Sequence, residues 1–202
     1  MDEEKRQWIA EERAKRVGSI KEALHAFLGG SKAFTLEIGC GHGRWLSRYA
    51  ESHPDEKCVG IDLITKRIEM GMAKKEKRSI DNLTFIKAEC GEFLEAVSIS
   101  PELQIARCFM LFPDPWPKKR HHKKRMVQTA FLSELEQLMP EGGWFCFRTD
   151  HEDYFAWTEE HVSEHSAWVQ SDSAVNWPFE NSSFFQDLLP EYQSLIAVKK
   201  GS

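Results

Sequence analysis

Residues 33–45 read AFTLEIGCGHGRW, in which an apolar run leads into three glycines at alternate positions. The run AFTLEI predicts a buried strand, and the residues from 43 to 52 have the apolar spacing of a helix. Glycine tolerates the positive φ angles of a tight turn, so a strand, a glycine turn and a helix together bring backbone N–H groups close to a ligand. The residues that we expect to line this loop are Glu37, Gly39, Gly41 and Gly43. A glycine turn with only a structural role is the alternative.

Short apolar runs alternate with amphipathic stretches along the rest of the chain. The predicted strands cover residues 33–38, 57–61, 83–87, 104–112, 144–149 and 194–198. The predicted helices cover residues 2–16, 19–28, 43–52, 65–77, 91–98, 126–138 and 151–164. Strands that alternate with helices favour βαβ units and a mostly parallel, doubly wound α/β sheet. Ligands of such sheets bind beyond the carboxyl ends of the strands, so the residues just after each strand form the candidate site.

The chain has the size and composition of one globular domain. Its 202 residues, of which 41% are hydrophobic and 29% charged, are enough to bury a sizeable core. No repeat, low-complexity tract or long Gly/Ser linker divides the sequence. We therefore expect a single domain over residues 1–202, with an N-terminal helical segment at 1–30 and the α/β core at 31–202.

The sequence predicts a cytoplasmic protein. The start, MDEEKRQWIAEERAKR, lacks the apolar segment of an export signal, and no apolar run approaches the roughly 20 residues that span a bilayer. The five cysteines are widely spaced without a C-x-x-C pair, which is typical of small buried side chains. We expect no disulfide framework, no metal site and no membrane contact.

One basic stretch contrasts with a formal net charge of -5 for the whole chain. Residues 131–202 carry 13 acidic and 3 basic side chains, a balance of -10, whereas residues 1–130 carry 24 basic and 19 acidic ones, a balance of +5. Residues 112–125, FPDPWPKKRHHKKR, contain six Lys/Arg and two His. A local basic segment on an acidic protein indicates contact with a polyanion such as a nucleic acid, although charge runs are also common as solvated faces.

Acidic side chains follow the second and third predicted strands. Asp62 lies 19 residues after Gly43, which suits a carboxylate that accepts hydrogen bonds from ribose hydroxyls; a helix-capping role near Thr65 is the alternative. The third strand runs into KAECGEF and so places Glu89 and Cys90 at the same edge. Here the alternative is an acidic first turn of the next helix.

The fourth predicted strand runs into PDPW. Proline fixes its own φ and restricts the residue before it, so this sequence predicts a stiff, extended loop that carries Asp114 and Trp116. Such a loop can hold a carboxylate against a substrate base at little further entropic cost. We expect Trp116 near the substrate; a surface proline turn with a core tryptophan is the alternative. The tryptophans predicted to pack in or beside the core are Trp45, Trp144, Trp157 and Trp168.

Three blocks taken together resemble the bacterial tRNA (guanine-N7-)-methyltransferase family: LEIGCGHGRW at 36–45, FPDPWPKKRHHKKR at 112–125 and FRTDHEDY at 147–154. The first block, with its E-x-G-x-G-x-G spacing, also resembles motif I of class I S-adenosylmethionine-dependent methyltransferases. The resemblance implies a seven-stranded Rossmann-like methyltransferase sheet with helices on both faces. It further implies methyl transfer from S-adenosylmethionine to N7 of a guanosine in the variable loop of tRNA. We expect tRNA as the partner and a monomer or weak homodimer.

The resemblance also implies roles for individual residues. The cofactor-binding positions are Glu37, Gly39, Gly41, Gly43, Asp62, Leu63, Glu89, Cys90 and Asp114, of which Asp114 is also the catalytic aspartate. The substrate-binding positions are Lys118, Asp150, Ser183 and Gln186. The RNA-facing segment consists of Arg120, His121, His122, Lys123, Lys124 and Arg125.

The chain departs from the family pattern at several places. Asp62 stands where the family usually has Glu, and Glu89 where it has Asp, so each charge is kept while its reach changes by one methylene. The family carries a T-x-F-E-x-R type motif near its C-terminal end, and the nearest match here is SFFQDL at 183–188, which lacks the glutamate and the arginine. The N-terminal segment lacks the arginine-rich arm of many members.

Other functions remain open on the sequence. The altered C-terminal motif is compatible with an accessory protein that binds RNA or cofactor with weak or no turnover. A methyltransferase that acts on another RNA or on a base amine is a further alternative. Residues 161–165, HVSEH, fit the H-x-x-E-H pattern of inverted zinc peptidases, although short motifs of this kind arise by chance.

Overall fold

The computed structural model describes residues 2–172, 177–180 and 191–201. Its α-helices are α1 (Glu3–Leu28), α2 (Arg44–Ser52), α3 (Thr65–Arg78), α4 (Cys90–Ser98), α5 (Thr129–Leu138) and α6 (Glu152–Glu164). Its strands are β1 (Ala33–Ile38), β2 (Cys58–Asp62), β3 (Leu83–Lys87), β4 (Gln104–Leu111), β5 (Trp144–Thr149), β6 (Trp168–Ser171) and β7 (Gln193–Lys199). A short 3-10 helix, η1 (Lys119–Lys124), follows β4.

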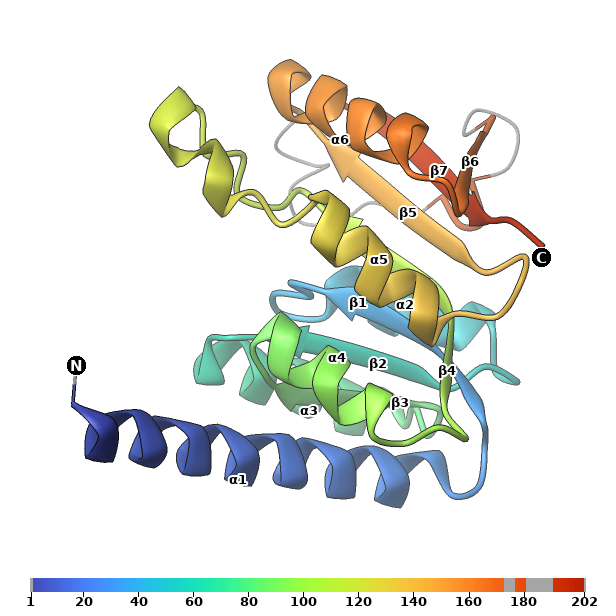
Figure 1. Ribbon diagram of the computed structural model, residues 1–202. Coiled ribbons are helices and arrows are strands. Elements are labelled where there is room, and N and C mark those ends of the chain that lie inside the picture. The colour runs from blue at the N-terminus through green and yellow to red at the C-terminus, as the bar shows by residue number, and fades with distance from the viewer. Residues whose placement is uncertain (1, 173–176, 181–190, 202) are drawn as a thin grey trace.

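These strands form one sheet in the order β3-β2-β1-β4-β5-β7-β6 (Figure 1). β1 to β5 run parallel, whereas β7 runs antiparallel to both β5 and β6. The expected mostly parallel, seven-stranded, doubly wound sheet is confirmed. The sequence does not predict β6, because four residues, WVQS, are too few for an alternating pattern to be recognised. Chain order reverses between β1 and β4, which is where such sheets bind ligands.

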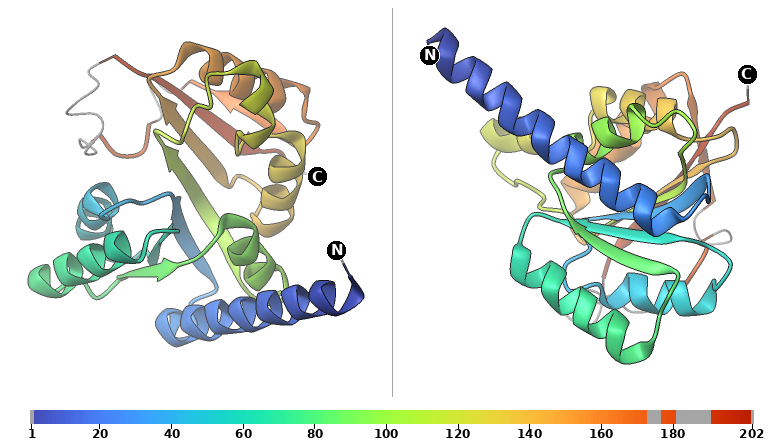
Figure 2. Two further views of the ribbon diagram at one scale, coloured as in Figure 1. Left: turned by 90° about the vertical axis from the view of Figure 1, so that its left-hand side faces the viewer. Right: turned by 90° about the horizontal axis from the view of Figure 1, so that it is seen from below.

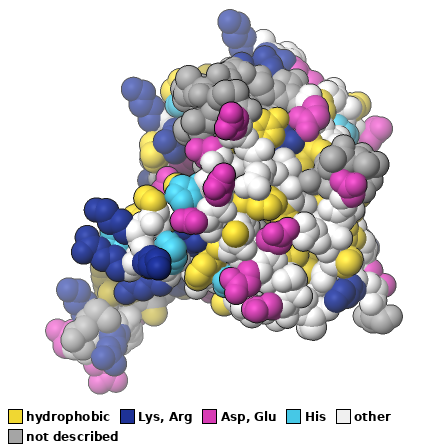
Figure 3. Space-filling view, turned by 90° about the horizontal axis from the view of Figure 1, so that it is seen from above, with side chains coloured by type: hydrophobic (Ala, Val, Ile, Leu, Met, Phe, Trp, Pro, Cys, Tyr) yellow, Lys and Arg dark blue, Asp and Glu magenta, His cyan; other side chains and the backbone are white. Residues whose placement is uncertain are grey.

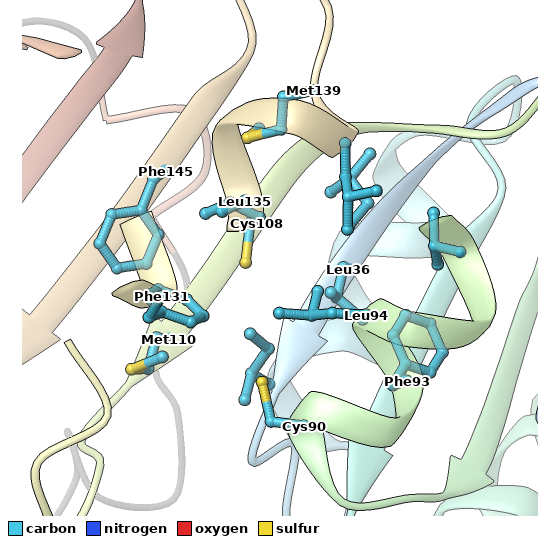
Figure 4. Packing of buried hydrophobic residues seen from close by; sticks show 14 of the residues in the cluster. Leu36, Cys90, Phe93, Leu94, Cys108, Met110, Phe131, Leu135, Met139 and Phe145 are labelled. Carbon is cyan, nitrogen blue, oxygen red and sulfur yellow. The ribbon is translucent and has the colours of Figure 1, made fainter. Parts of the chain in front are cut away.

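Helices cover both faces of the sheet. α1, α4, α5 and α6 lie on one face and α2 and α3 on the other (Figures 1 and 2). On the first face, Leu36, Leu94 and Leu135 belong to a cluster of buried side chains from β1, α4 and α5 (Figure 4). On the second face, Trp45 of α2 packs against Phe109 of β4, with ring centroids 4.5 Å apart. Strands β1, β2 and β5 are thus buried on both sides, as continuous apolar runs predict.

A single helix, α1, replaces the two helices that the sequence predicts at 2–16 and 19–28. Gly18 lies inside it, although glycine in a helix interior costs about 1 kcal/mol relative to alanine. A stripe of buried side chains runs through this point and consists of Val17, Ile20, Leu24 and Leu28. Packing of this stripe against α4 and the neighbouring part of the sheet offsets the cost of the glycine.

Helix α5 begins at Thr129, three residues later than the predicted start at 126. The hydroxyl of Tyr154 accepts hydrogen bonds from the backbone N–H groups of Met126 and Val127, at 3.1 and 3.3 Å. These bonds satisfy N–H groups that lack partners inside a helix, and they tie the segment before α5 to α6.

None of the described helices is long and apolar enough to cross a membrane. Within the described ranges, no group of three or more His, Cys, Asp or Glu side chains is arranged to hold a metal ion. The histidines of HVSEH have separate neighbours: Nδ1 of His161 lies 2.8 Å from the carbonyl oxygen of Trp157, and Nε2 of His165 lies 3.0 Å from the hydroxyl of Ser133. The zinc hypothesis therefore gains no support from the geometry.

Candidate active site at the carboxyl edge of the sheet

The parallel strands bring the predicted site residues to one edge. Ile38 of β1 pairs with both Ile61 of β2 and Met110 of β4, and Ile61 pairs in turn with Ile86 of β3. The segments that follow these strands therefore leave the sheet side by side. The predicted residues at or beyond this edge are Glu37, Gly39, Gly41, Gly43, Asp62, Leu63, Glu89, Cys90, Asp114 and Asp150.

The glycine loop between β1 and α2 has the conformation that its sequence predicts. Gly39, Gly41 and Gly43 have φ angles of 72°, 54° and 64°, in the region where residues with a side chain are strained. The backbone N–H of Gly39 donates to the carbonyl of Ile61 at 2.9 Å. On its other side, Nζ of Lys74 donates to the carbonyl of His42 at 2.8 Å. The loop is thus fixed by β2 and α3 before any ligand binds.

Gly43 also makes room for a buried ring. A Cβ atom at Gly43 would lie 2.2 Å from Cζ of Phe85, and one at Gly60 would lie 2.7 Å from Cδ1 of the same ring. Gly71 of α3 approaches the ring as well, with a Cβ-to-ring distance of 3.0 Å. Phe85 therefore fills a space left by three glycines from three elements. Sequence reasoning misses this packing role, because the three glycines are far apart along the chain.

Asp62 is held by hydrogen bonds at the end of β2, next to the start of α3. Its buried carboxylate accepts hydrogen bonds from the backbone N–H groups of Gly41 at 3.1 Å and Ile64 at 2.8 Å. Nη1 of Arg67 lies 3.3 Å from the same group. Asp62 therefore ties the glycine loop to the start of α3. Beside it, Leu63 and Ile64 are 65% and 47% exposed, which leaves an apolar surface at the edge of the site.

Glu37 is a buried carboxyl group with an incomplete set of partners. Its residue is 4% exposed, and Oε2 has no hydrogen-bond partner among the described residues. Burial raises the pKa of Glu37 to about 8, the backbone of Leu46 acts in the opposite direction through a hydrogen bond, and the negative charge of Asp62 raises the value further. The unfilled acceptor marks this position as one that a donor group on a ligand would complete.

The raised pKa of Glu37 predicts that the free energy of unfolding depends on pH. A glutamate in an unfolded chain has a pKa of about 4.3, whereas native Glu37 has a pKa of about 8 and so keeps its proton up to that pH. Native protein therefore binds more protons between these values, so this group's contribution to the free energy of unfolding falls as pH rises and is lost above about pH 8. We expect Glu37→Gln to remove that contribution. In urea unfolding, the variant's stability relative to wild type should rise steadily towards pH 8; a difference that is independent of pH would contradict the assignment.

Glu89 caps the helix that follows β3. Its side chain is exposed, and Oε2 accepts a hydrogen bond from the backbone N–H of Glu92 at 3.1 Å. The thiol of Cys90 points into the core, and burial raises its pKa to about 12. A hollow of about 300 Å³ separates α4 from the basic segment, with Glu89 and Lys123 on its walls. Glu89 is thus the N-cap of α4, and its exposed carboxylate lies at the site's edge.

The PDPW loop is held in a strained backbone conformation. Phe112 and Trp116 have φ angles of 52° and 46°, which are uncommon for residues with bulky side chains. The backbone N–H of Phe112 donates to the carbonyl of Arg148 in β5 at 2.7 Å. Between Phe112 and Trp116, Asp114 is exposed at the carboxyl edge. Trp116 is half-buried, and Nζ of Lys124 lies 4.4 Å from its ring centroid.

The basic stretch forms the 3-10 helix η1 beside this loop. Its exposed members are Lys119, Arg120, Lys123 and Lys124, whereas His121 and His122 are half-buried. Lys118, just before the helix, is also exposed. In Figure 3, Lys and Arg side chains gather at a projecting corner with histidine beside them, while acidic side chains are spread over the middle of the same face. This arrangement offers one edge of the molecule to a polyanion.

Arg125 does not belong to that exposed surface, so its expected place in the exposed RNA-facing segment is corrected. The residue is 1% exposed. Its Nε donates to the carbonyl of Pro115 at 2.9 Å and its Nη1 to the carbonyl of Asp153 at 3.1 Å. The guanidinium lies over the ring of Tyr154 at 5.0 Å. Arg125 therefore fastens the PDPW loop to α6, and its charge is not available to a phosphate at the surface.

The end of β5 supplies a further carboxylate and a buried cation. Asp150 is exposed directly after β5. Arg148, which sequence reasoning misses, is 2% exposed and lies between the rings of Trp177 and Tyr192, at 3.8 and 4.6 Å from their centroids. Nη2 of Arg148 pairs with Glu180 at 2.7 Å. Ser183 and Gln186, which are predicted to bind substrate, lie outside the described residues.

Solved methyltransferase structures share this fold. The antibiotic-resistance methyltransferase Kmr has a TM-score of 0.56 with 17% identity, over 90% of this chain and 93% of that chain. Precorrin-6y C5,15-methyltransferase from Geobacter metallireducens GS-15 also has a TM-score of 0.56, with 12% identity over 90% of this chain and 88% of that chain. At these identities the likeness concerns the fold alone.

Sequence comparison identifies the family. A protein named tRNA (guanine-N(7)-)-methyltransferase from Nitrosococcus oceani is 35% identical over 135 residues, which are 67% of this chain and 56% of that protein. A protein of the same name from Listeria monocytogenes serotype 4b is 30% identical over 171 residues, which are 85% of this chain and 77% of that protein. The match thus spans little more than half of the first relative. The family described as putative methyltransferase matches residues 31–186. The chain belongs to the tRNA (guanine-N(7)-)-methyltransferase family.

Proposed function

We propose that this chain transfers a methyl group from S-adenosylmethionine to N7 of a guanosine in tRNA, in the variable loop. The observation that carries the proposal is the position of Asp114. This exposed carboxylate sits on a strained loop beside the glycine loop, and the exposed cations of η1 follow it directly. The names of the relatives point to the same substrate. Since tRNA is the proposed substrate, the proposed place of action is the cytoplasm.

The residues at the edge fit S-adenosylmethionine. The unpartnered Oε2 of buried Glu37 suits a donor group of this molecule, and Asp62 lies where ribose hydroxyls are bound in such sheets. The exposed side chains of Leu63 and Ile64 suit the flat adenine ring. Glu89 stands at the next strand end, within the same edge. When bound, the cofactor supplies an electrophilic methyl group on a positively charged sulfur.

In the proposed reaction, the protein contributes by positioning the base and by stabilising the charge that develops on it. N7 of guanine already carries a lone pair, so no base needs to remove a proton before it attacks the methyl group. The product guanine is cationic, and a carboxylate close to the ring favours the charge that develops. Asp114 and Asp150, on the loops after β4 and β5, are placed to accept hydrogen bonds from the N–H edge of the base and to hold it in line.

Exposed cations of η1 predict salt-dependent binding of tRNA. Neutralising a phosphate with Lys or Arg releases counterions, so the slope of log affinity against log salt reports the number of such contacts. We expect Lys123→Ala/Lys124→Ala to make this slope shallower by about two units. Lys77→Ala, which removes an exposed cation from α3, should leave the slope unchanged. Equal slopes for wild type and the double variant would contradict a phosphate-binding role for η1.

Methyl transfer to unmodified tRNA transcripts tests the proposed function. The expected product is 7-methylguanosine, which borohydride and aniline treatment converts into a strand break at the methylated position. A single break in the variable loop is the result that the proposal requires. Binding of tRNA and S-adenosylmethionine without any transfer would favour an accessory protein instead, and methylation at another position would favour a different RNA methyltransferase.

A further inference from the structure

A groove of about 270 Å³ lies between η1 and the first turns of α6, and we call it the η1–α6 groove. Its polar and aromatic lining residues are Lys119, His122, Arg125, Asp153, Trp157 and Glu160. Pockets for drug-sized molecules measure roughly 300–1,000 Å³, so this groove suits a smaller group. It adjoins the surface that the proposed function assigns to RNA.

Two residues that line the groove each carry a buried polar atom without a partner. Nη2 of Arg125 and Nε2 of His122 are shielded from water, and no described residue offers either of them a hydrogen bond. The Arg125 side chain is almost fully buried, and its other nitrogens, Nε and Nη1, already donate to backbone carbonyls. Buried polar groups are nearly always paired in native proteins. A ligand in the groove that presents acceptor atoms would complete these positions.

An aromatic wall of the groove is fixed in place. Nε1 of Trp157 donates to the carbonyl of Val127 at 2.7 Å. The ring of His161 stacks on the indole at 4.4 Å, and the ring of His122 meets it edge-on at 5.7 Å. The guanidinium of Arg125 also lies over the indole, 5.3 Å from its centroid. Because these neighbours hold it, Trp157 is a rigid part of the groove wall and loses little side-chain freedom when a ligand binds.

The charges around the groove select against a bare phosphate. Lys119, His122 and Arg125 provide donors, but the exposed carboxylates of Asp153 and Glu160 lie on the opposite wall and would repel an anion. A nucleobase, by contrast, carries acceptor and donor atoms on one edge and matches a mixed wall of this kind. We propose that the η1–α6 groove holds a nucleobase of the tRNA other than the guanine that is methylated. This inference rests on the proposed function.

A base in the groove would be joined to the catalytic loop through one residue. Nε of Arg125 donates to the carbonyl of Pro115, next to Asp114, and Arg125 is also one of the residues that line the groove. The groove therefore gives the protein a second point of contact with the RNA, at a fixed position relative to Asp114. Two such contacts set the register of the RNA on the protein. The groove therefore helps to determine which guanosine reaches the active site.

Removing the carboxylates of the groove tests the proposal, because a groove that binds a base and a groove that only repels phosphates predict opposite changes in tRNA affinity. Loss of negative charge from an RNA-binding surface normally strengthens binding, because repulsion of phosphates is reduced. If Asp153 and Glu160 accept hydrogen bonds from a base, Asp153→Ala/Glu160→Ala should instead weaken tRNA binding roughly ten-fold. The matched control, Glu152→Ala/Glu164→Ala, removes the same charge from the same helix outside the groove and should bind tRNA as tightly as wild type or more tightly.

A set of tRNA transcripts that each lack one base identifies the occupant. One missing base should weaken binding to wild type and have no further effect on Asp153→Ala/Glu160→Ala, which is the coupling expected of direct contact. The groove proposal would be overturned if the double variant bound intact tRNA more tightly than wild type. It would also be overturned if each missing base lowered the tRNA affinity of both proteins equally. Methyl transfer to the intact transcript separates the groove proposal from the proposed function. If wild type transfers methyl groups but shows no such coupling, the groove proposal fails and the proposed function stands. If wild type neither binds tRNA nor transfers methyl groups, both fail.

Discussion

Asp114→Ala is expected to slow single-turnover methyl transfer to tRNA by roughly a hundred- to a thousand-fold, the range seen when one preorganised electrostatic group is removed from an active site. The carboxylate stands on a loop whose backbone is fixed by hydrogen bonds at Phe112 and Pro115, so little reorganisation is needed when the base arrives. Because Asp114 is exposed, its removal leaves no cavity. The unfolding midpoint and the affinity for tRNA should therefore stay close to those of wild type.

Two further variants separate charge from hydrogen bonding at this position. Asp114→Asn keeps an acceptor oxygen without the negative charge, so its rate should lie between those of wild type and Asp114→Ala. Asp81→Ala removes an exposed carboxylate from the turn before β3, at the opposite edge of the sheet, and should transfer methyl groups at the wild-type rate. A wild-type rate in Asp114→Ala would show that the carboxylate takes no part in the reaction.

Gly43→Ala is expected to lower the free energy of unfolding by about 2–5 kcal/mol. Part of this loss, about 1–2 kcal/mol, is the cost of a side chain at a φ of 64°. The remainder comes from the new Cβ, which would lie 2.2 Å from Cζ of Phe85 and 2.4 Å from Cε1. Gly41→Ala separates the two contributions, because Gly41 has a similar φ of 54° but no described atom lies within 4 Å of the place that its Cβ would take. Urea unfolding of both variants measures the difference.

A double-mutant cycle checks that the clash with Phe85 is the cause. Phe85→Leu removes the ring atoms that meet the new Cβ, so Gly43→Ala should cost less in that background than in wild type. The recovered stability should approach the difference between Gly43→Ala and Gly41→Ala. Additive effects of the two changes would contradict the packing argument and leave only backbone strain.

Much of the fold follows from the sequence because the strands of a doubly wound sheet are buried on both faces. β1 to β5 appear as continuous apolar runs, and the glycines after β1 appear at the spacing that a tight turn requires. The positions of Glu37, Asp62 and Asp114 at the carboxyl edge follow from the same reasoning, because each lies at or just beyond a strand end.

Features that depend on contacts between distant segments do not follow from the sequence. Arg125 ends a run of basic residues that are mostly exposed, yet it is buried because carbonyls of Pro115 and Asp153 meet it from two separate segments. The packing of Phe85 against Gly43, Gly60 and Gly71 likewise joins three elements. In both cases the local pattern gives the residue type but not its neighbours.

Methyl transfer to a tRNA in which 7-deazaguanosine replaces guanosine tests the central claim most directly. This analogue keeps the Watson–Crick edge of guanine but has a C–H group where N7 should carry the attacking lone pair. The account predicts that wild-type protein binds both RNAs with similar affinity, methylates the guanosine RNA once in the variable loop, and transfers nothing to the 7-deaza RNA. Transfer to the 7-deaza RNA at a comparable rate would contradict attack by N7 and place the reaction on another atom.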